Sequence, residues 1–181
     1  MPAPTEDSSP IDNFSHCHEG IVRQLDALAE LPQLLEPAMR ARQIARDTLA
    51  FFQGPVLDHH REEERDLFPA VLLHARAGAE HTQVEAMVDM LTAQHREIET
   101  MWRQLQPQLS RVEGGTEVKL DTGMLERLVR TYKSHAHWEE VKFLPLAHDI
   151  LGRHGEDLAA LGLALHTRHV VTAARRGLRG S

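Results

Sequence analysis

The chain has 181 residues, of which 41% are hydrophobic, 26% are charged and only 4% are aromatic. These values are typical of a globular domain with its own core, and the scarcity of aromatic and β-branched runs disfavours a large β-sheet. The net charge of -7 disfavours a nucleic-acid partner, and the single cysteine excludes an internal disulfide and a cysteine-only metal site. Composition alone does not explain the 13 histidines.

Apolar residues recur at helical spacing along most of the chain, so the predicted elements are helices. A Pro- and Ser-rich arm is followed by helices at about residues 14–30, 38–75, 82–109, 121–151 and 156–176. Pro32 and Pro37 are expected to end the first helix. The second helix is expected to bend at Gly54–Pro55 and at Pro69, where a backbone donor is missing. Asp121 is expected to cap the fourth helix.

These helices predict an all-α fold, an antiparallel up-and-down four-helix bundle with an additional C-terminal helix. The chain divides into a disordered arm (1–10), the bundle (11–151) and an accessory helix with a basic tail (152–181). The arm lacks the basic start and apolar core of a signal peptide, and no apolar run approaches about 18 residues. We therefore expect a cytoplasmic protein without a membrane partner. An apolar stripe on the last helix would suit bundle packing or a homodimer.

An internal repeat contains the residues that are candidates for a functional site. The segment HHREEERDLFP (59–69) is matched later in the chain by HAHWEEVKFLP (135–145). Both read H-x-x-x-E-E, two residues, two apolar residues and proline. A second match lies around His18 and His95, where the flanking apolar positions agree at almost the same offset along the chain. The chain therefore carries the series His, H-x-x-x-E, His, H-x-x-x-E.

Helix geometry predicts that this series faces inward: His18, His59, Glu63, His95, His135 and Glu139. Each H-x-x-x-E pair shares a helix face because residues four apart lie one turn apart. The two single histidines lie on apolar stripes. His95 precedes the end of its predicted helix at Leu109 by the same number of positions by which His135 follows Asp121. Because every helical residue adds the same rise, both histidines are expected at one level of the bundle.

Inward polar groups need partners, and a pair of metal ions would supply them. Imidazole and carboxylate suit iron, manganese, zinc and copper, whereas the lack of thiolates disfavours copper(I) and an iron–sulfur cluster. Two iron ions fit best, with two histidines on each, bridging glutamates and an oxo or hydroxo bridge; manganese or zinc would also suit. The Glu-x-x-His of ferritin-like proteins, the H-E-x-x-H of zinc proteases and a glycine-rich phosphate loop are missing from the sequence.

The doubled H-x-x-x-E-E, with its trailing apolar residues and proline, resembles the motif of the hemerythrin-like, HHE cation-binding family. The resemblance covers roughly residues 11–151 and implies an all-α bundle around a non-haem di-iron centre, with the six residues above as ligands and Glu63 and Glu139 as bridges. Oxygen-carrying hemerythrins have a further histidine on the third helix, where this chain has Leu91 and Glu99. The chain is therefore more similar to bacterial stress-response members. Those that repair iron–sulfur clusters carry a cysteine-containing domain with no counterpart in these residues.

Other residues are candidates for supporting roles. Tyr132 lies three residues before His135 on the inward side, where it would hydrogen-bond a bound oxygen species or a ligand glutamate, or pack as a core tyrosine. Glu99, one turn after His95, would be a seventh ligand, or would support the ligands or face solvent. The other nine histidines, His60 among them, lack repeat support and are expected at the surface or behind the ligands. Glu64 is expected on a solvated face.

Two classes of function remain open. A binding or sensing protein would hold O2, NO or a related oxidant at an open iron position, in iron handling or in oxidative or nitrosative stress. An enzyme would turn over peroxide or NO with an unidentified redox partner, or donate iron for cluster repair; no catalytic residue is assigned. A structural bundle with zinc or no metal is a third reading. The fold does not decide among them, because function depends on the site.

Overall fold

The computed structural model describes the backbone of residues 10–153 and the side chains of residues 19–153. Every regular element in this part of the chain is a helix, as predicted, and none is a strand. The predicted helix at 156–176 and most of the predicted arm lie outside the described residues. The chain divides into two units, Met1–Ile44 and Ala45–Ser181.

The first helix is longer than expected. α1 (Pro10–Phe51) runs through Pro32 and Pro37, so the expected break between the first two helices is wrong. An interior proline deprives the carbonyl four residues earlier of its donor. Here those carbonyls belong to Leu28 and Gln33, on a stretch exposed from residue 21 to residue 44. Water can therefore satisfy them, and the helix continues.

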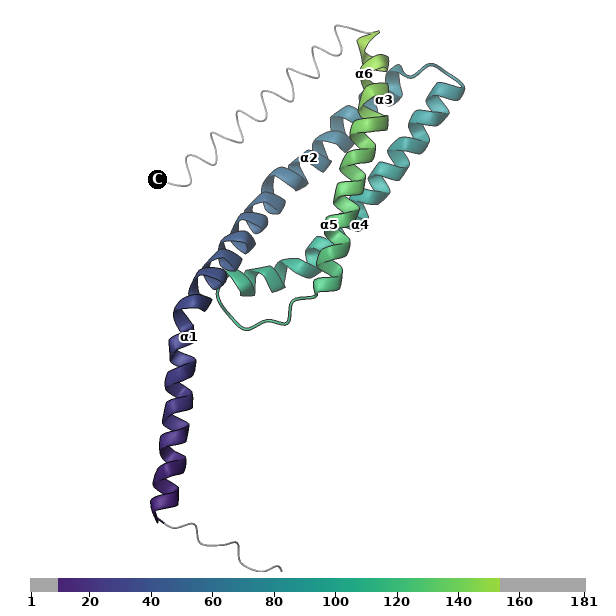
Figure 1. Ribbon diagram of the computed structural model, residues 1–181. Coiled ribbons are helices and arrows are strands. Elements are labelled where there is room, and N and C mark those ends of the chain that lie inside the picture. Colours follow the sequence, from purple (N-terminus) through teal and green to yellow (C-terminus); the bar gives the residue numbers. More distant parts are fainter. Residues whose placement is uncertain (1–9, 154–181) are drawn as a thin grey trace, which may run out of the picture. The chain divides into compact units, whose positions relative to one another are not determined.

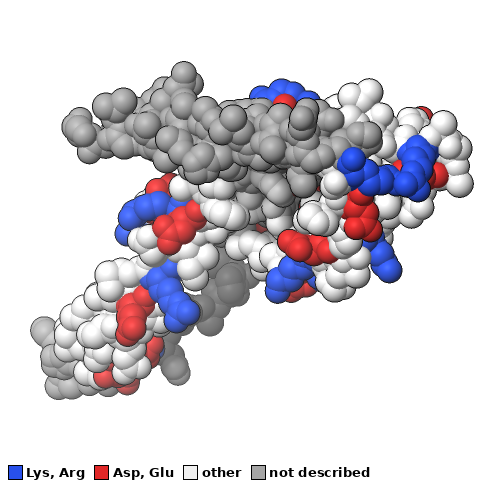
Figure 2. Space-filling model, turned by 90° about the horizontal axis from the view of Figure 1, so that it is seen from above, with Lys and Arg blue, Asp and Glu red and all other residues white. Residues whose placement is uncertain are grey.

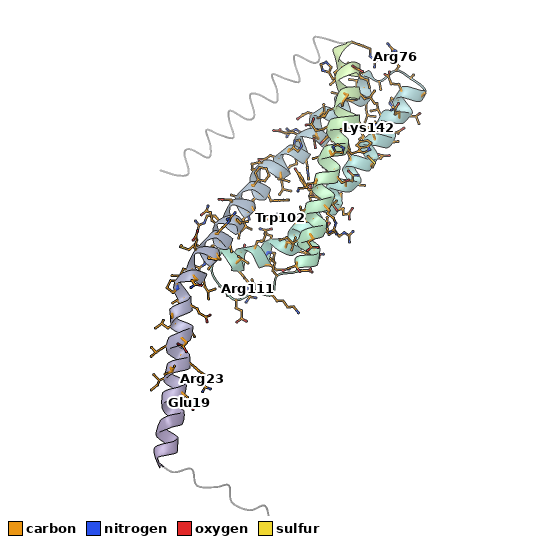
Figure 3. The ribbon with its side chains drawn as sticks, viewed as in Figure 1. Glu19, Arg23, Arg76, Trp102, Arg111 and Lys142 are labelled. Carbon is orange, nitrogen blue, oxygen red and sulfur yellow. The ribbon has the colours of Figure 1, made fainter. Side chains whose placement is uncertain are left out.

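The part of α1 in the first unit keeps its apolar stripe on the surface. Ile21, Leu25, Leu28, Leu35 and Met39 are each between 51% and 62% exposed. Their spacing of three, four or seven residues places them along one side of the helix. Figure 3 shows side chains of this segment, with Glu19 and Arg23 labelled. The sequence therefore supplies an apolar helix face of the kind that packs against other helices.

The second unit contains the end of α1 and the helical elements that follow it. After α1 come η1 (Phe52–Val56), α2 (Leu57–Glu62), η2 (Glu63–Leu67) and α3 (Phe68–His74). A turn at Gly78, with φ of 98°, leads into α4 (Ala79–Glu113). A loop then leads to α5 (Thr122–Trp138), η3 (Glu139–Phe143) and α6 (Leu144–Gly152). α4 packs along α5, and α3 packs against α4 and α6 (Figure 1).

The predicted cap of α5 is confirmed. The amide of Met124 donates to Oδ1 of Asp121 at 2.9 Å, which satisfies one of the free donors of the first turn. On the face shown in Figure 2, acidic and basic side chains lie interspersed instead of gathering by sign. No helix in the described part of the chain is long and apolar enough to span a membrane.

Near the prolines where bends were expected, the helix contains π-helical turns. Pro55 lies within η1, while η2 and η3 end just before Pro69 and Pro145. In η2 and η3 the backbone bond runs back five residues, from Phe68 to Glu63 and, in the second half of the repeat, from Leu144 to Glu139. Both predicted glutamate ligands therefore begin a π turn. Such turns are frequent at functional sites.

Two apolar clusters form the core of the second unit. The first comprises Ala45, Leu49, Ile98, Met101, Trp102, Leu105, Leu109 and Leu128. The second comprises Phe68, Val71, Val84, Leu91, Phe143, Ala147, Ile150 and Leu151. In the first, Trp102, which is labelled in Figure 3, stacks on Phe52 with ring centroids 4.2 Å apart. Along α4 the second cluster ends at Leu91 and the first begins at Ile98, which leaves a layer around His95 between them.

Candidate metal centre

The layer between the two apolar clusters is polar. Five buried polar residues occupy the described interior: His60, Glu63, His95, His135 and Glu139. None of them is more than 5% exposed. Because apolar side chains lie on both sides, these groups are largely withdrawn from water. Their burial is costly unless other partners satisfy them.

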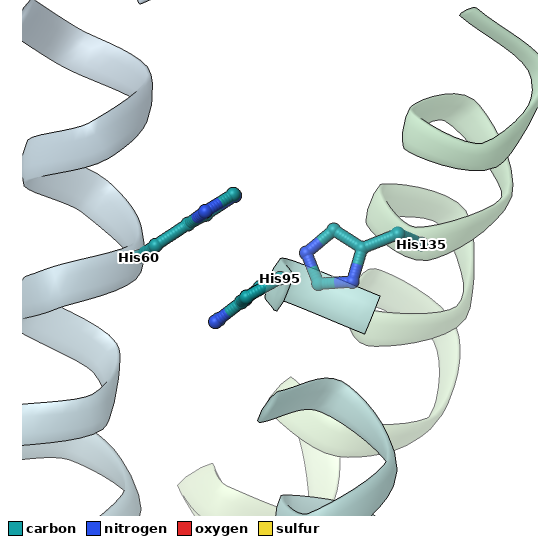
Figure 4. A group of neighbouring side chains, drawn as sticks. All are labelled: His60, His95 and His135. Carbon is teal, nitrogen blue, oxygen red and sulfur yellow. The ribbon is translucent and has the colours of Figure 1, made fainter. Parts of the chain in front are cut away.

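Three histidines from three helices converge in this layer (Figure 4). His60 lies on α2, His95 on α4 and His135 on α5. The rings of His60 and His95 are stacked at 3.9 Å with 6° between their planes, and His135 meets His95 edge-on at 4.9 Å. The short distance between His95 and His135 confirms that they share a level. One ring nitrogen from each of the three lies within 4.8 Å of the others.

Each of the three rings has an acceptor at Nδ1. The acceptors are Glu64 Oε1 at 2.8 Å from His95, Gln94 Oε1 at 3.0 Å from His135, and Glu99 Oε1 at 3.4 Å from His60. A proton held on Nδ1 leaves Nε2 as a bare acceptor. All three Nε2 atoms are buried without a hydrogen-bond partner. Metal-binding histidines have this arrangement, with one nitrogen anchored and the other free.

A single arginine links two of these acceptors. Arg96 donates to Glu64 from one guanidinium nitrogen. A second guanidinium nitrogen donates to Glu99 Oε1 at 3.5 Å. Its positive charge therefore partly offsets the negative charge of the two carboxylates that hold His95 and His60. Arg96 itself is 55% exposed, so this contact lies at the edge of the layer.

A second group of donors adjoins the three histidines. His59, Glu63 and Glu139 also bring one ligand atom each within 4.8 Å. Glu63 spans the two groups, because its Oε1 lies 3.1 Å from His59 Nε2 and its Oε2 lies 3.3 Å from His95 Nε2. Neighbouring ligands of one metal ion are about 3–3.4 Å apart when each metal–ligand bond is about 2.1 Å. These distances fit a carboxylate shared between two ions.

Glu139 occupies the equivalent place in the other half of the repeat. Its Oε2 lies 3.8 Å from His135 Nε2, and its Oε1 is buried without a partner. Burial, reinforced by the nearby Glu63 carboxylate, raises the pKa of Glu139 to about 9. Without a cation, Glu139 therefore keeps its proton at neutral pH. A metal ion would take the place of that proton.

The histidines respond to burial in the opposite direction. Burial, with a further contribution from His95, lowers the pKa of His60 to about 3 and that of His135 to about 4. Both rings are therefore neutral at pH 7, which is the form that binds metals. The donor set thus combines bare imidazoles with carboxylates, and this combination suits iron, manganese or zinc.

The second group borders a pocket of about 260 Å³. His59, Glu63 and Glu139 line it together with Leu67 and Leu144. His59 is the exposed member, with 52% of its side chain accessible, whereas Glu63 is 5% exposed. A small molecule can therefore reach the carboxylate side of the layer in this unit.

Tyr132 borders the histidine side of the layer. Its ring lies 6.1 Å from that of His60 and 6.0 Å from that of His135. Burial, followed by the negative charges of Glu63 and Glu139, raises the pKa of the tyrosine hydroxyl. Tyr132 is therefore a proton-bearing group next to the donors, although no hydrogen bond to any of them is seen in the described structure.

Comparison with known proteins identifies the family. The profile of the hemerythrin HHE cation binding domain matches residues 9–147, which is most of the chain. The chain belongs to the hemerythrin HHE cation-binding domain family. It is also similar to an uncharacterized protein of Haemophilus influenzae, with 28% identity over 160 residues covering 84% of this chain and 90% of that protein. No solved structure matches the chain significantly.

The structure brings most of the predicted HHE residues together. Five of the six predicted ligands lie in the two donor groups: His59, Glu63, His95, His135 and Glu139. His18 lies on α1, but its side chain is outside the described side chains. Glu99 holds Nδ1 of His60 at 3.4 Å. Tyr132 borders the site without a direct polar contact.

Sequence reasoning about this HHE chain missed three residues. His60, expected at the surface or behind the ligands, is 1% exposed and offers a bare nitrogen. Glu64, expected on a solvated face, accepts from His95, and Gln94 accepts from His135. One signal was available for His60. It lies four residues after Val56, which is buried, and three before Glu63, so helical spacing alone places it inward.

Proposed function

We propose that this HHE domain binds a pair of iron ions. The observation that carries the proposal is a set of buried potential ligand atoms that have no hydrogen-bond partner. They are Nε2 of His60, His95 and His135, Oε2 of Glu63 and Oε1 of Glu139. Unsatisfied polar atoms at this density are costly in an interior and call for a further partner such as an ion. The membership in a cation-binding family supports the same conclusion.

The proposed ligands are those of the repeat, His18, His59, Glu63, His95, His135 and Glu139, with the two glutamates as bridges. The Glu63 distances to His59 and His95 support its bridging role. The assignment of His18 rests on the match between its surroundings and those of His95 in the sequence. An antiparallel four-helix bundle, in which residues 14–30 supply the remaining helix, is part of this proposal. The accessory helix at the C-terminus is also part of it.

The proposed role is the binding or sensing of O2, NO or a related small oxidant, in iron handling or in oxidative or nitrosative stress. A bound iron pair would supply an open coordination position and a change of oxidation state. The chain's own contribution is the pocket at His59, Glu63 and Glu139, which admits a small molecule, and the apolar walls of Leu67 and Leu144, which limit water. We place this activity in the cytoplasm, with no membrane or nucleic-acid partner.

Turnover of peroxide or NO is the second candidate, and Tyr132 is the observation that favours it. Its hydroxyl keeps its proton, and its ring lies about 6 Å from the rings of two histidines of the site. Positioned proton donors typically contribute a factor of about 100 or more to a reaction rate. A Tyr132→Phe variant should therefore retain its iron but turn over peroxide about 100-fold more slowly. Equal turnover by the variant would remove Tyr132 from any such reaction.

Iron uptake by a double variant tests the main proposal. His59→Ala with His135→Ala removes one imidazole from each donor group, so we expect the anaerobically reconstituted variant to lose its iron. His137→Ala is the matched control, because His137 is exposed and lies two residues from His135. The control should bind iron as the wild type does. Retention of both irons in the double variant would refute the assignment.

A further inference from the structure

We infer that His60 is a fifth histidine ligand and shares one metal ion with His95 and His135. The inference deepens the proposed function, because it assumes that the layer binds metal. The H-x-x-x-E repeat does not contain His60, since the corresponding position in the second half is Ala136. The argument for His60 comes from its contacts alone.

The two ring nitrogens of His60 are in contrasting surroundings. Nδ1 faces Glu99 Oε1 at 3.4 Å, whereas Nε2 is buried without a partner. A histidine that served only to fill the core would leave this nitrogen desolvated at a cost in stability. The same pattern occurs at His95 and His135, both of which are proposed ligands. His60 therefore shares the chemical state of the ligands and not that of the exposed histidines.

The position of His60 also brings it within reach of a shared ion. Its ring lies 3.9 Å from the ring of His95 and 5.9 Å from that of His135. Neighbouring nitrogens on one ion lie about 3–3.4 Å apart, given metal–nitrogen bonds of about 2.1 Å. The three nitrogens, within 4.8 Å of one another, must therefore close by at most about 1.8 Å. His60 must also turn out of its parallel stack, which a change of side-chain torsions allows.

This assignment makes the two metal positions unequal. One ion would have three imidazole ligands in the buried part of the layer. The other would lie among His59, Glu63 and Glu139, beside the pocket of about 260 Å³.

The test is an anaerobic titration of the metal-free protein with Co(II), followed by absorption. His60→Leu removes the imidazole and keeps an apolar side chain of similar size. We expect it to weaken one of the two Co(II) sites by at least tenfold and to change the absorption of that site. Its metal-free melting temperature should stay close to that of the wild type. Unchanged affinities and spectra would overturn the inference while leaving the proposed function intact.

A second variant covers the case in which His60→Leu does not fold. Glu99→Ala leaves the interior unchanged but removes the acceptor that holds His60 Nδ1. Loss of such an acceptor typically weakens metal binding about 10–100-fold, so the same Co(II) site should be affected. An effect on neither site would contradict the inference. A wild-type protein that takes up no Co(II) would instead overturn the proposed function, and the inference with it.

Discussion

At the scale of single residues, the acceptors at Nδ1 distinguish this layer from a set of histidines that merely pack together. Glu64 and Glu99 carry charge, whereas Gln94 does not, so the three imidazoles differ in how strongly they are polarised. A carboxylate acceptor raises the basicity of the ligating nitrogen more than an amide does. His95 and His60 should therefore be the stronger donors, and His135 the weaker one.

Arg96 should influence the reduction potential of the iron centre through its charge. In the iron-loaded protein, Arg96→Gln removes the cation that partly offsets the charge of Glu64 and Glu99. The more negative surroundings favour the ferric state, so the reduction potential should fall, by some tens of millivolts once solvent screening is included. Arg127→Gln is the control. Arg127 is 64% exposed, and it pairs with Glu97, which lies on α4 as Glu99 does.

Measurement of both potentials by redox titration decides the matter. A drop in Arg96→Gln with no change in Arg127→Gln is the expected result. Equal shifts in the two variants would indicate that general surface charge, and not the contact with the histidine acceptors, sets the potential.

The residue scale also shows how far the sequence was informative. The H-x-x-x-E repeat led to four residues of the two donor groups, because spacing of four on a helix fixes a shared face whatever the tertiary structure. The match between the surroundings of His18 and His95 led to the fifth, His95. The acceptors Glu64 and Gln94 could not be recognised in this way. Each reaches across from a different helix to the histidine that it holds, and such pairs depend on packing that spacing along one helix does not reveal.

At the scale of elements, the π turns connect the prolines of the repeat with its glutamates. Pro69 and Pro145 cannot donate a backbone bond, and in both halves the helix widens over the five residues that begin with Glu63 or Glu139. The prolines predict a disturbance of the helix, but not its π-helical form. Regular α-helical spacing does not include the shift in phase that a π turn gives to the residues that follow.

Replacing Pro145 should have opposite effects on the stability of the helix and on the affinity for metal. In Pro145→Ala the missing donor is restored and a regular α-helical turn becomes available, so the metal-free protein should melt at the same or a higher temperature. Loss of the π turn changes the phase between Glu139 and the buried residues that follow it, so Glu139 should bind metal at least about tenfold more weakly, an effect of the size seen when ligand orientation is lost. Calorimetry and a metal titration measure the two effects.

Pro107→Ala provides the comparison, since Pro107 lies inside α4 at an exposed position. It should stabilise the helix in the same way without changing metal affinity. If Pro145→Ala binds metal as tightly as Pro107→Ala does, the π turn does not position Glu139.

Substitutions in the apolar stripe of α1 test the predicted four-helix bundle. If Leu25 and Leu28 pack against other helices, as their spacing predicts, then Leu25→Glu with Leu28→Glu should be strongly destabilising. Burying one leucine contributes about 1.5–3 kcal/mol, so the pair should lower the melting temperature by several degrees and reduce iron content. Arg23→Glu on the same helix is the control. A double variant as stable as the control would exclude packing of this stripe.

At the scale of the whole molecule, the buried donors should set the pH dependence of the metal-free protein. The pKa of Glu139 is about 9 in the folded chain, against a reference value of 4.5. Between pH 4.5 and pH 9 the folded state therefore binds more protons than the unfolded state, and stability falls as the pH rises. His60 and His135 titrate near 3 and 4 instead of 6.5, so stability falls as pH drops below 6.5. From these groups, the stability maximum lies near pH 6.5.

Thermal melts of the chelator-treated protein between pH 4 and pH 9 measure this profile. Melting temperatures should decline on both sides of the maximum, and bound metal should remove the decline on the alkaline side because it replaces the proton of Glu139. A metal-free protein whose melting temperature does not fall between pH 6.5 and pH 9 would show that Glu139 ionises freely in the fold.

The iron content of the reconstituted protein tests the central claim most directly. The metal-free chain would be titrated with Fe(II) under anaerobic conditions, freed of unbound iron and analysed for metal per polypeptide. The donor layer predicts two irons per chain, which the double variant His59→Ala with His135→Ala should lose. A well-folded wild-type chain that takes up no iron from a stoichiometric excess would contradict the assignment of this layer as an iron site.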